Sequence, residues 1–118
     1  MNVEQCAKLF ALFAALEDIT PYQPLLDAAV IECRQQLKEG ADESDIRLCY
    51  YCAAIANLRY TQMIAARSTL SHTYAGTLAK SHDETIPHRF AERLWQEYRA
   101  LAKDLLRNED VLFSAMVG

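Results

Sequence analysis

Four cysteines are the residues with the clearest potential for chemistry in this sequence of 118 residues. Cys49 and Cys52 form a C-x-x-C motif, a spacing used in thiol–disulfide exchange and in zinc sites. A redox motif of this kind needs the first turn of a helix after a strand, whereas this one falls inside a predicted helix. A zinc site needs two more ligands, and Cys6 and Cys33 are not spaced as a second pair. We therefore interpret the cysteines as small buried side chains, with a metal or redox site on Cys49 and Cys52 as the alternative.

The histidines and carboxylates form no recognisable catalytic pattern. His72, His82 and His88 lack the i, i+4 spacing with an intervening glutamate that is typical of helical zinc sites. Glu92 and Glu97 would point to different sides of a helix. The sequence contains no G-x-S-x-G elbow, glycine-rich phosphate loop or dinucleotide fingerprint. We therefore predict a protein that is not an enzyme, with no cofactor, no metal and no catalytic residue.

Charge restricts the partners that the chain can bind. It carries 12 Lys and Arg against 16 Asp and Glu, so it lacks the concentrated positive surface of a general nucleic-acid-binding protein. One local basic face is predicted in the last helix, where the helical period brings four cations within about a third of the circumference. These cations are Arg89, Arg93, Lys103 and Arg107. The face is either an ordinary solvated surface or one that meets an acidic protein or DNA phosphates.

Length and composition favour a single helical domain covering residues 1–118. Hydrophobic residues make up 52% of the chain, and only 3 Gly and 3 Pro occur. This composition favours helix over strand. Hydrophobic periodicity and capping residues predict an all-α fold, a small bundle of four main helices. The helices are expected over residues 2–18, 20–40, 42–67 and 83–108, with Asp42 or Ser44 capping the third and Asp83 or Thr85 capping the fourth.

The third predicted helix is apolar around most of its circumference. Between Leu48 and Ala66, the clearly polar side chains are only Asn57, Arg59, Thr61 and Gln62. Such a helix is expected to be central in the bundle or covered by another chain.

Two segments outside the predicted helices are candidates for binding partners. Residues 68–85 break the helical period, which predicts a long exposed loop before the last helix, with a short hairpin as an alternative. Residues 108–118 form a tail that is too apolar for a solvated terminus. The residues we predict to bind partners are Tyr74, Gly76, Leu78, Val111, Leu112 and Phe113.

No targeting segment is evident in the sequence. The apolar run near the start contains Glu4 and Lys8 and lacks the organisation of a signal peptide. No apolar stretch approaches the length of a membrane-spanning helix. We therefore expect a cytoplasmic protein that binds no membrane and whose cysteines stay reduced.

The order of elements resembles the small head–tail connector (adaptor) proteins of tailed bacteriophages and prophages. The shared pattern comprises two short helices, a long Ala- and Tyr-rich helix (CYYCAAIANLRYTQMIAAR), a Y-A-G-T-L element and an amphipathic helix ending in DLLRNEDVLF. Tyr74 and Gly76 match an aromatic residue that often precedes a glycine in this family. The family's closing leucines, acidic pair and aromatic residue are matched by Leu105, Leu106, Glu109, Asp110 and Phe113.

The resemblance implies a structural subunit of a ring, without catalysis or cofactor. Such a ring would join the portal protein to a downstream tail or stopper protein, in the bacterial cytoplasm and in the virion. DNA would only pass through its channel, and a net charge of −4 suits a channel wall that repels phosphate. The alternative from the residues alone is a small helical regulatory module that binds protein or nucleic acid through the basic face.

Overall fold

The computed structural model describes the backbone of residues 1–75 and 79–107 and the side chains of residues 1–67 and 86–107. Four α-helices account for most of this part of the chain, which contains no strand. The predicted all-α bundle of four main helices is therefore confirmed. The helices are α1 (Val3–Ala14), α2 (Gln23–Gln35), α3 (Ile46–Ala75) and α4 (Ala79–Leu101), with short 3₁₀ helices at Thr20–Tyr22 and Lys103–Leu105.

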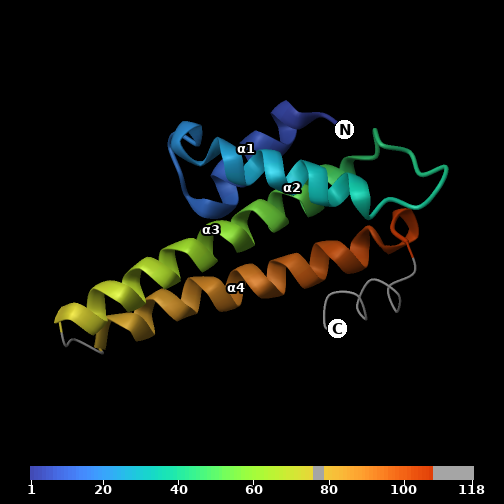
Figure 1. Cartoon of the computed structure of the whole chain (residues 1–118). Coiled ribbons are helices and arrows are strands. Elements are labelled where there is room, and N and C mark those ends of the chain that lie inside the picture. The colour runs from blue at the N-terminus through green and yellow to red at the C-terminus, as the bar shows by residue number, and fades with distance from the viewer. Residues whose placement is uncertain (76–78, 108–118) are drawn as a thin grey trace.

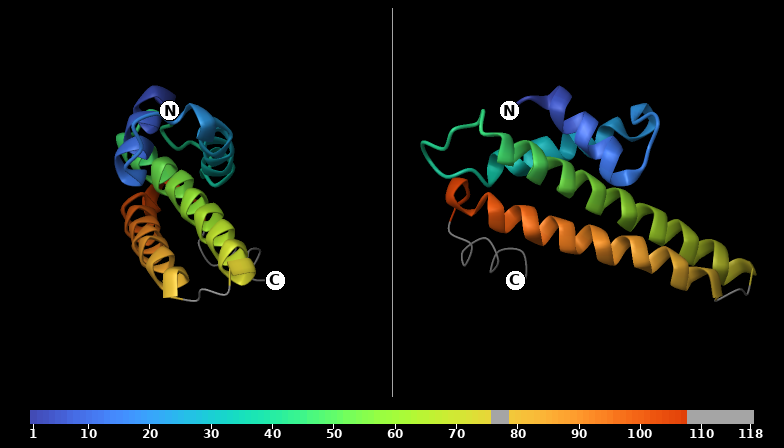
Figure 2. Two further views of the ribbon diagram at one scale, coloured as in Figure 1. Left: turned by 90° about the vertical axis from the view of Figure 1, so that its left-hand side faces the viewer. Right: turned by 180° about the vertical axis from the view of Figure 1, so that it is seen from behind.

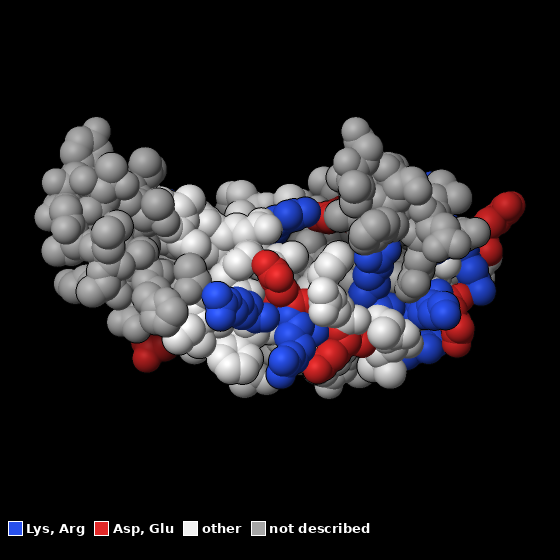
Figure 3. Space-filling view, turned by 90° about the horizontal axis from the view of Figure 1, so that it is seen from below, with Lys and Arg blue, Asp and Glu red and all other residues white. Residues whose placement is uncertain are grey.

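Helix α3 is the central element of the bundle. It runs side by side with α4 in the opposite direction, and α1 and α2 pack against its other side (Figures 1 and 2). The outer side of α4, turned away from α3, forms much of the surface seen in Figure 3. The prediction that this apolar helix is central is confirmed. None of the helices in the described ranges is long and apolar enough to cross a membrane.

The core surrounds the first half of α3. From Leu48 to Leu58 every side chain is buried except Tyr50, which is half-buried. Phe10 of α1 and Leu26 of α2 are fully buried in the same cluster. Tyr51 is fully buried, and its hydroxyl donates a hydrogen bond to Gln36 Oε1 at 2.5 Å. Burial raises the pKa of Tyr51 to about 12.

Local capping explains the bounds of the first two helices. Asn2 Oδ1 accepts the amide of Gln5 at 3.1 Å, which confirms the predicted start of α1. The helix ends at Ala14, a few residues before the predicted stop, because Ala15 is left-handed with a φ of 55°. Thr20 begins a 3₁₀ turn, and α2 itself starts at Gln23 with Pro24 in its first turn. Helix α2 ends at Gln35, and Gly40, with a φ of 81°, lies in the following connection.

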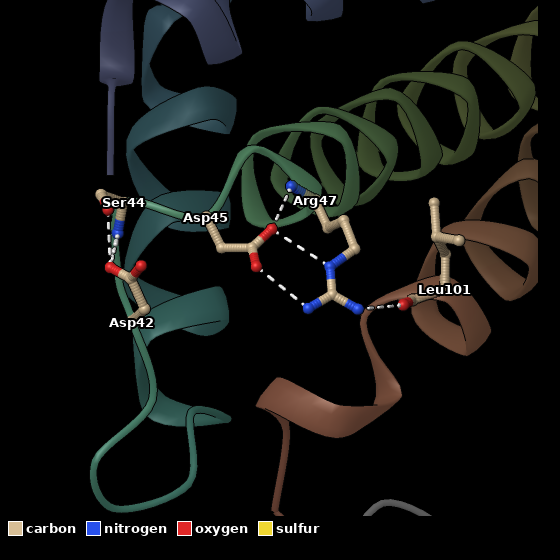
Figure 4. A network of polar contacts seen from close by, with 5 residues as sticks. All are labelled: Asp42, Ser44, Asp45, Arg47 and Leu101. Carbon is tan, nitrogen blue, oxygen red and sulfur yellow. Dashed lines mark hydrogen bonds and ion pairs between the residues drawn. The ribbon is translucent and has the colours of Figure 1, made fainter.

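Asp45 starts α3, in place of the predicted caps Asp42 and Ser44. Its Oδ1 accepts the amide of Arg47 at 2.9 Å, and its carboxylate also receives the guanidinium of Arg47 (Figure 4). Arg47 Nη1 in turn donates to the carbonyl of Leu101 at 3.1 Å, so the start of α3 is tied to the end of α4. Asp42 instead accepts the amide and hydroxyl of Ser44 in a local turn.

We expect Asp45→Ala to lower the midpoint of thermal unfolding by a few degrees, because both the cap and the support of Arg47 are lost. Hydrogen bonds from Arg47 lower the pKa of Asp45 from its ordinary 3.8. The stabilisation that the Asp45 carboxylate gives to the fold is therefore complete above about pH 4, and it is lost as the pH falls through the pKa of Asp45 in the folded protein. Thermal melts at neutral pH and near pH 3 measure the effect. Asp42→Ala is the matched control, since its bonds stay within one turn, and an equal loss in both variants would contradict the assignment.

The structure corrects the prediction of a long loop, or a short hairpin, over residues 68–85. Residues 68–75 continue α3 and residues 79–85 begin α4, whereas residues 76–78 lie outside the described part of the chain. The helix propensities of Ser, Thr and His are only about 0.5 kcal/mol poorer than that of Ala. Their abundance therefore does not end helices that pack against each other.

Both ends of α4 also differ from the prediction. The helix begins at Ala79, so Pro87 lies in its interior, where the missing amide removes one helical hydrogen bond. It ends at Leu101, well before the predicted Asn108. The chain then turns back to the end of α2, where the amide of Arg107 donates to the carbonyl of Gln36 at 2.8 Å.

Candidate functional site

The outer side of α4 carries large apolar side chains without cover from the described residues. Ala91 of α4 and Ala102, directly after the helix, are buried on the side that faces the bundle. Beside them, Ile86, Phe90 and Leu101 are 42%, 64% and 54% exposed. Their spacing places them within about 60° of one another around the helix. We call Ile86, Phe90 and Leu101 the α4 stripe; exposed apolar side chains that gather on one side of a helix favour a protein-binding site.

The predicted basic face is divided between α4 and the segment that follows it. Arg89, Arg93, Lys103 and Arg107 are all exposed. Because α4 ends at Leu101, only the two arginines share the helical period, which corrects the prediction of one continuous stripe. Acidic side chains are also exposed here: Glu92, Glu97 and Asp104. Blue and red side chains accordingly alternate on this side of the molecule (Figure 3), which does not favour phosphate binding.

The six residues predicted to bind partners lie outside the part of the chain whose side chains are described. They are Tyr74, Gly76, Leu78, Val111, Leu112 and Phe113. Only the backbone of Tyr74 is placed, as part of α3. Their role stays a prediction.

The C-x-x-C motif lies in the interior of α3, and all four cysteines are buried free thiols. The structure brings Cys6 of α1 and Cys33 of α2 into the same core cluster as Cys49 and Cys52. Sequence spacing gave no sign of this convergence, because it depends on how three helices pack. Among the described residues, no group of His, Cys, Asp and Glu side chains could hold a metal ion.

A polar chain between α3 and α4 is the feature that sequence reasoning missed. His88 Nδ1 lies 3.0 Å from Thr61 Oγ1, and His88 Nε2 lies 2.8 Å from Glu92 Oε1. A hydroxyl, an imidazole and a carboxylate in series are the components of a nucleophile–base pair. The spacing of His88 and Glu92, four residues apart on one helix, was the available signal.

The contacts of Thr61, His88 and Glu92 link α3 to α4. The Thr61 hydroxyl donates to the carbonyl of Leu58 at 2.9 Å, within its own helix. Amides in the interior of a helix already donate to carbonyls one turn earlier, so they leave no pair of donors for an oxyanion. These polar contacts therefore fix α4 against α3 at the level of His88.

A cavity of about 240 Å³ opens between α2, α3 and α4. Ile55, Leu58 and Trp95 contribute its apolar lining, and Arg59 and Glu32 form an ion pair of 3.1 Å at its polar end. Arg59 also donates to Gln62 at 3.2 Å, so its guanidinium is held by groups of the chain itself. The charged side chains that line the cavity therefore pair with other groups of the protein, and they indicate no particular ligand.

Comparison with models of protein families, with curated proteins and with solved structures finds no match to this chain. Among the described residues, the α4 stripe gathers three exposed large apolar side chains on one side of a single helix.

Proposed function

We propose that this chain is a structural assembly subunit, and that the α4 stripe of one copy binds the α1–α2 side of the next. Phe90 carries this proposal, because a phenylalanine that is 64% exposed on a regular helix exposes apolar area that association would bury. Aromatic side chains of this kind are favoured at the centre of protein interfaces.

Helices α1 and α2 each expose a large apolar side chain. Leu12 of α1 and Ile31 of α2 are 71% and 58% exposed. These helices lie across α3 from most of α4 (Figure 2). A subunit with two different binding surfaces associates head to tail, and such contacts close into a ring when the rotation between subunits permits.

Charge favours a second copy as the occupant of these surfaces. Residues 1–35 contain five acidic side chains against Lys8 and Arg34, a net charge of −3. Residues 86–107 contain five Lys and Arg against three acidic side chains, a net charge of +2. Contact between α4 of one copy and the α1–α2 side of another therefore brings opposite charges together, which steers association and selects this orientation.

The head–tail connector resemblance gives this assembly a specific form. In that form, copies make a ring between a portal protein and a downstream tail or stopper protein, with DNA passing through the channel. The ring would be built in the bacterial cytoplasm and retained in the virion. The segments that contain Tyr74, Gly76 and Leu78, and Val111, Leu112 and Phe113, would meet the portal and tail components.

Phe90→Glu is expected to abolish association of copies, because it places a charge in the centre of the proposed contact and weakens it by about 100-fold or more. Native mass spectrometry measures the outcome. The unaltered chain should give multiples of its 13.4 kDa mass, whereas the variant should give single chains at the same concentration.

Gln96→Glu is the matched control, since it adds the same charge at an exposed position of α4 away from the stripe. It should assemble like the unaltered chain. The proposal is wrong if Phe90→Glu assembles normally, or if the unaltered chain stays a single 13.4 kDa chain at high concentration.

A further inference from the structure

The four cysteines form a cluster of thiols between α1, α2 and α3. Cys6, Cys33 and Cys52 are 0% exposed and Cys49 is 3% exposed. Cys6 comes from α1, Cys33 from α2, and the other two from adjacent turns of α3. This convergence is independent of the α4 stripe and of the proposed assembly.

The first turn of α1 places Cys6 beside Cys49. The carbonyl oxygen of Asn2 accepts the amide of Cys6 at 3.1 Å and the thiol of Cys49 at 3.7 Å, which fixes Cys49 beside the start of α1. Cys52 lies three residues further along α3, on the same face of that helix. Cys52 and Cys49 are the side chains that lower the pKa of Cys6, and all three belong to the same buried cluster.

These contacts distinguish the reactivity of the thiols. The hydrogen bond from Cys52, assisted by that from Cys49, outweighs burial and lowers the pKa of Cys6. The same hydrogen bond to Cys6, together with burial, raises the pKa of Cys52, and burial raises the pKa of Cys33 to about 12. Since the thiolate is the reactive form of cysteine, Cys6 is expected to react with an oxidant before the other three thiols.

We propose that Cys6 and Cys52 form an intramolecular disulfide when the protein is exposed to hydrogen peroxide. The Cys6 thiolate attacks one peroxide oxygen, giving a sulfenic acid on Cys6 and releasing hydroxide. The Cys52 sulfur then attacks the Cys6 sulfur, the S–S bond forms, and the sulfenic oxygen leaves as water with the thiol proton. Overall, two thiols lose two electrons and two protons, and one peroxide becomes two waters.

The competing pair within the C-x-x-C motif is disfavoured by helix geometry. Side chains three apart on a helix have Cβ atoms about 5–6 Å apart. A disulfide needs a Cβ separation of roughly 3.8 Å, so joining Cys49 to Cys52 would distort α3. Joining Cys6 to Cys52 links two helices whose contact already exists. Peroxide, which is little larger than water, reaches the cluster when the exposed first turn of α1 opens locally.

Peptide mapping of the full chain tests this proposal without a variant. After peroxide treatment, free thiols are alkylated under denaturing conditions and the chain is cut with trypsin. Residues 1–8, 9–34 and 48–59 then separate Cys6 and Cys33 from the pair in α3, and fragmentation between Tyr50 and Tyr51 distinguishes Cys49 from Cys52. We expect two of the four thiols to be lost and residues 1–8 to be linked to 48–59 through Cys52.

Thermal melts give a second readout. The linkage closes a long loop and should raise the midpoint of unfolding by about 5–10 °C, and dithiothreitol should reverse the shift. Cys52→Ala should lose both the linkage and the shift, whereas Cys33→Ala should retain them. A Cys6 thiol that stays alkylatable after treatment, or a bond from Cys6 to Cys33, to Cys49 or to another chain, would overturn the proposal.

Discussion

Phe10→Ala should lower the free energy of unfolding by about 3–5 kcal/mol. Phe10 is fully buried in the core, and its ring meets that of Tyr60 edge to face with centroids 6.3 Å apart. Truncation removes the apolar area and leaves a cavity between α1 and α3 that the surrounding helices fill only in part. Because single domains are stable by only about 5–15 kcal/mol, urea unfolding should show a large shift of the midpoint.

Phe90→Ala provides the matched control for this result. The same substitution at a side chain that is 64% exposed should change the stability of the isolated chain by only about 0.5 kcal/mol. Equal losses at the two positions would contradict the assignment of Phe10 to the core and of Phe90 to the surface.

Ala53→Leu should destabilise the fold by about 1–3 kcal/mol or more. Ala53 is 0% exposed in the part of α3 that the other helices surround, so the added side chain has no free volume to occupy. Calorimetry of the unfolding transition measures the loss, and a heat of unfolding far below that of the unaltered chain would indicate that packing is no longer uniform.

Ala66→Leu tests the cause of this loss. Ala66 lies on the same helix but is exposed, and Ala and Leu have similar helix propensities. The stability of this variant should stay within about 0.5 kcal/mol of the unaltered chain. If both substitutions are tolerated equally, α3 is not the tightly packed centre of the bundle.

Hydrophobic periodicity predicted the architecture well because it reports directly on which side of a helix is buried. Apolar residues at helical spacing, among them Cys6 and Phe10 of α1 and Leu26 of α2, form the core with the nearly all-apolar third helix. The cap at Asn2 was also readable, since a side-chain acceptor three residues before the Gln5 amide is a local signal.

Helix ends and tertiary contacts were less accessible from the sequence. The helical continuation over residues 68–75 and 79–85 depends on the pairing of α3 with α4, which outweighs the modest propensities of Ser, Thr and His. The contact of Thr61 with His88 joins residues that are 27 positions apart in the sequence, and no local sequence pattern predicts that they meet.

The candidate surface could be anticipated only in outline. An apolar side and a basic side were predicted for the last helix, but exposure depends on how the helix is rotated against its neighbour. That rotation buries Ala91 and leaves Phe90 open to solvent. The cations Lys103 and Arg107 fall outside the helix because α4 ends at Leu101. The sequence contains no capping residue that predicts this end.

Mixing two assembly-deficient variants tests the head-to-tail arrangement most directly. Phe90→Glu disables the α4 stripe but keeps the α1–α2 side, whereas a variant with Leu12→Glu and Ile31→Glu does the reverse. Each should be a 13.4 kDa single chain alone, and the mixture should form a one-to-one complex of twice that mass that grows no further by sedimentation or native mass spectrometry. Variants that stay separate when mixed, or that each assemble alone, would contradict the proposed contact.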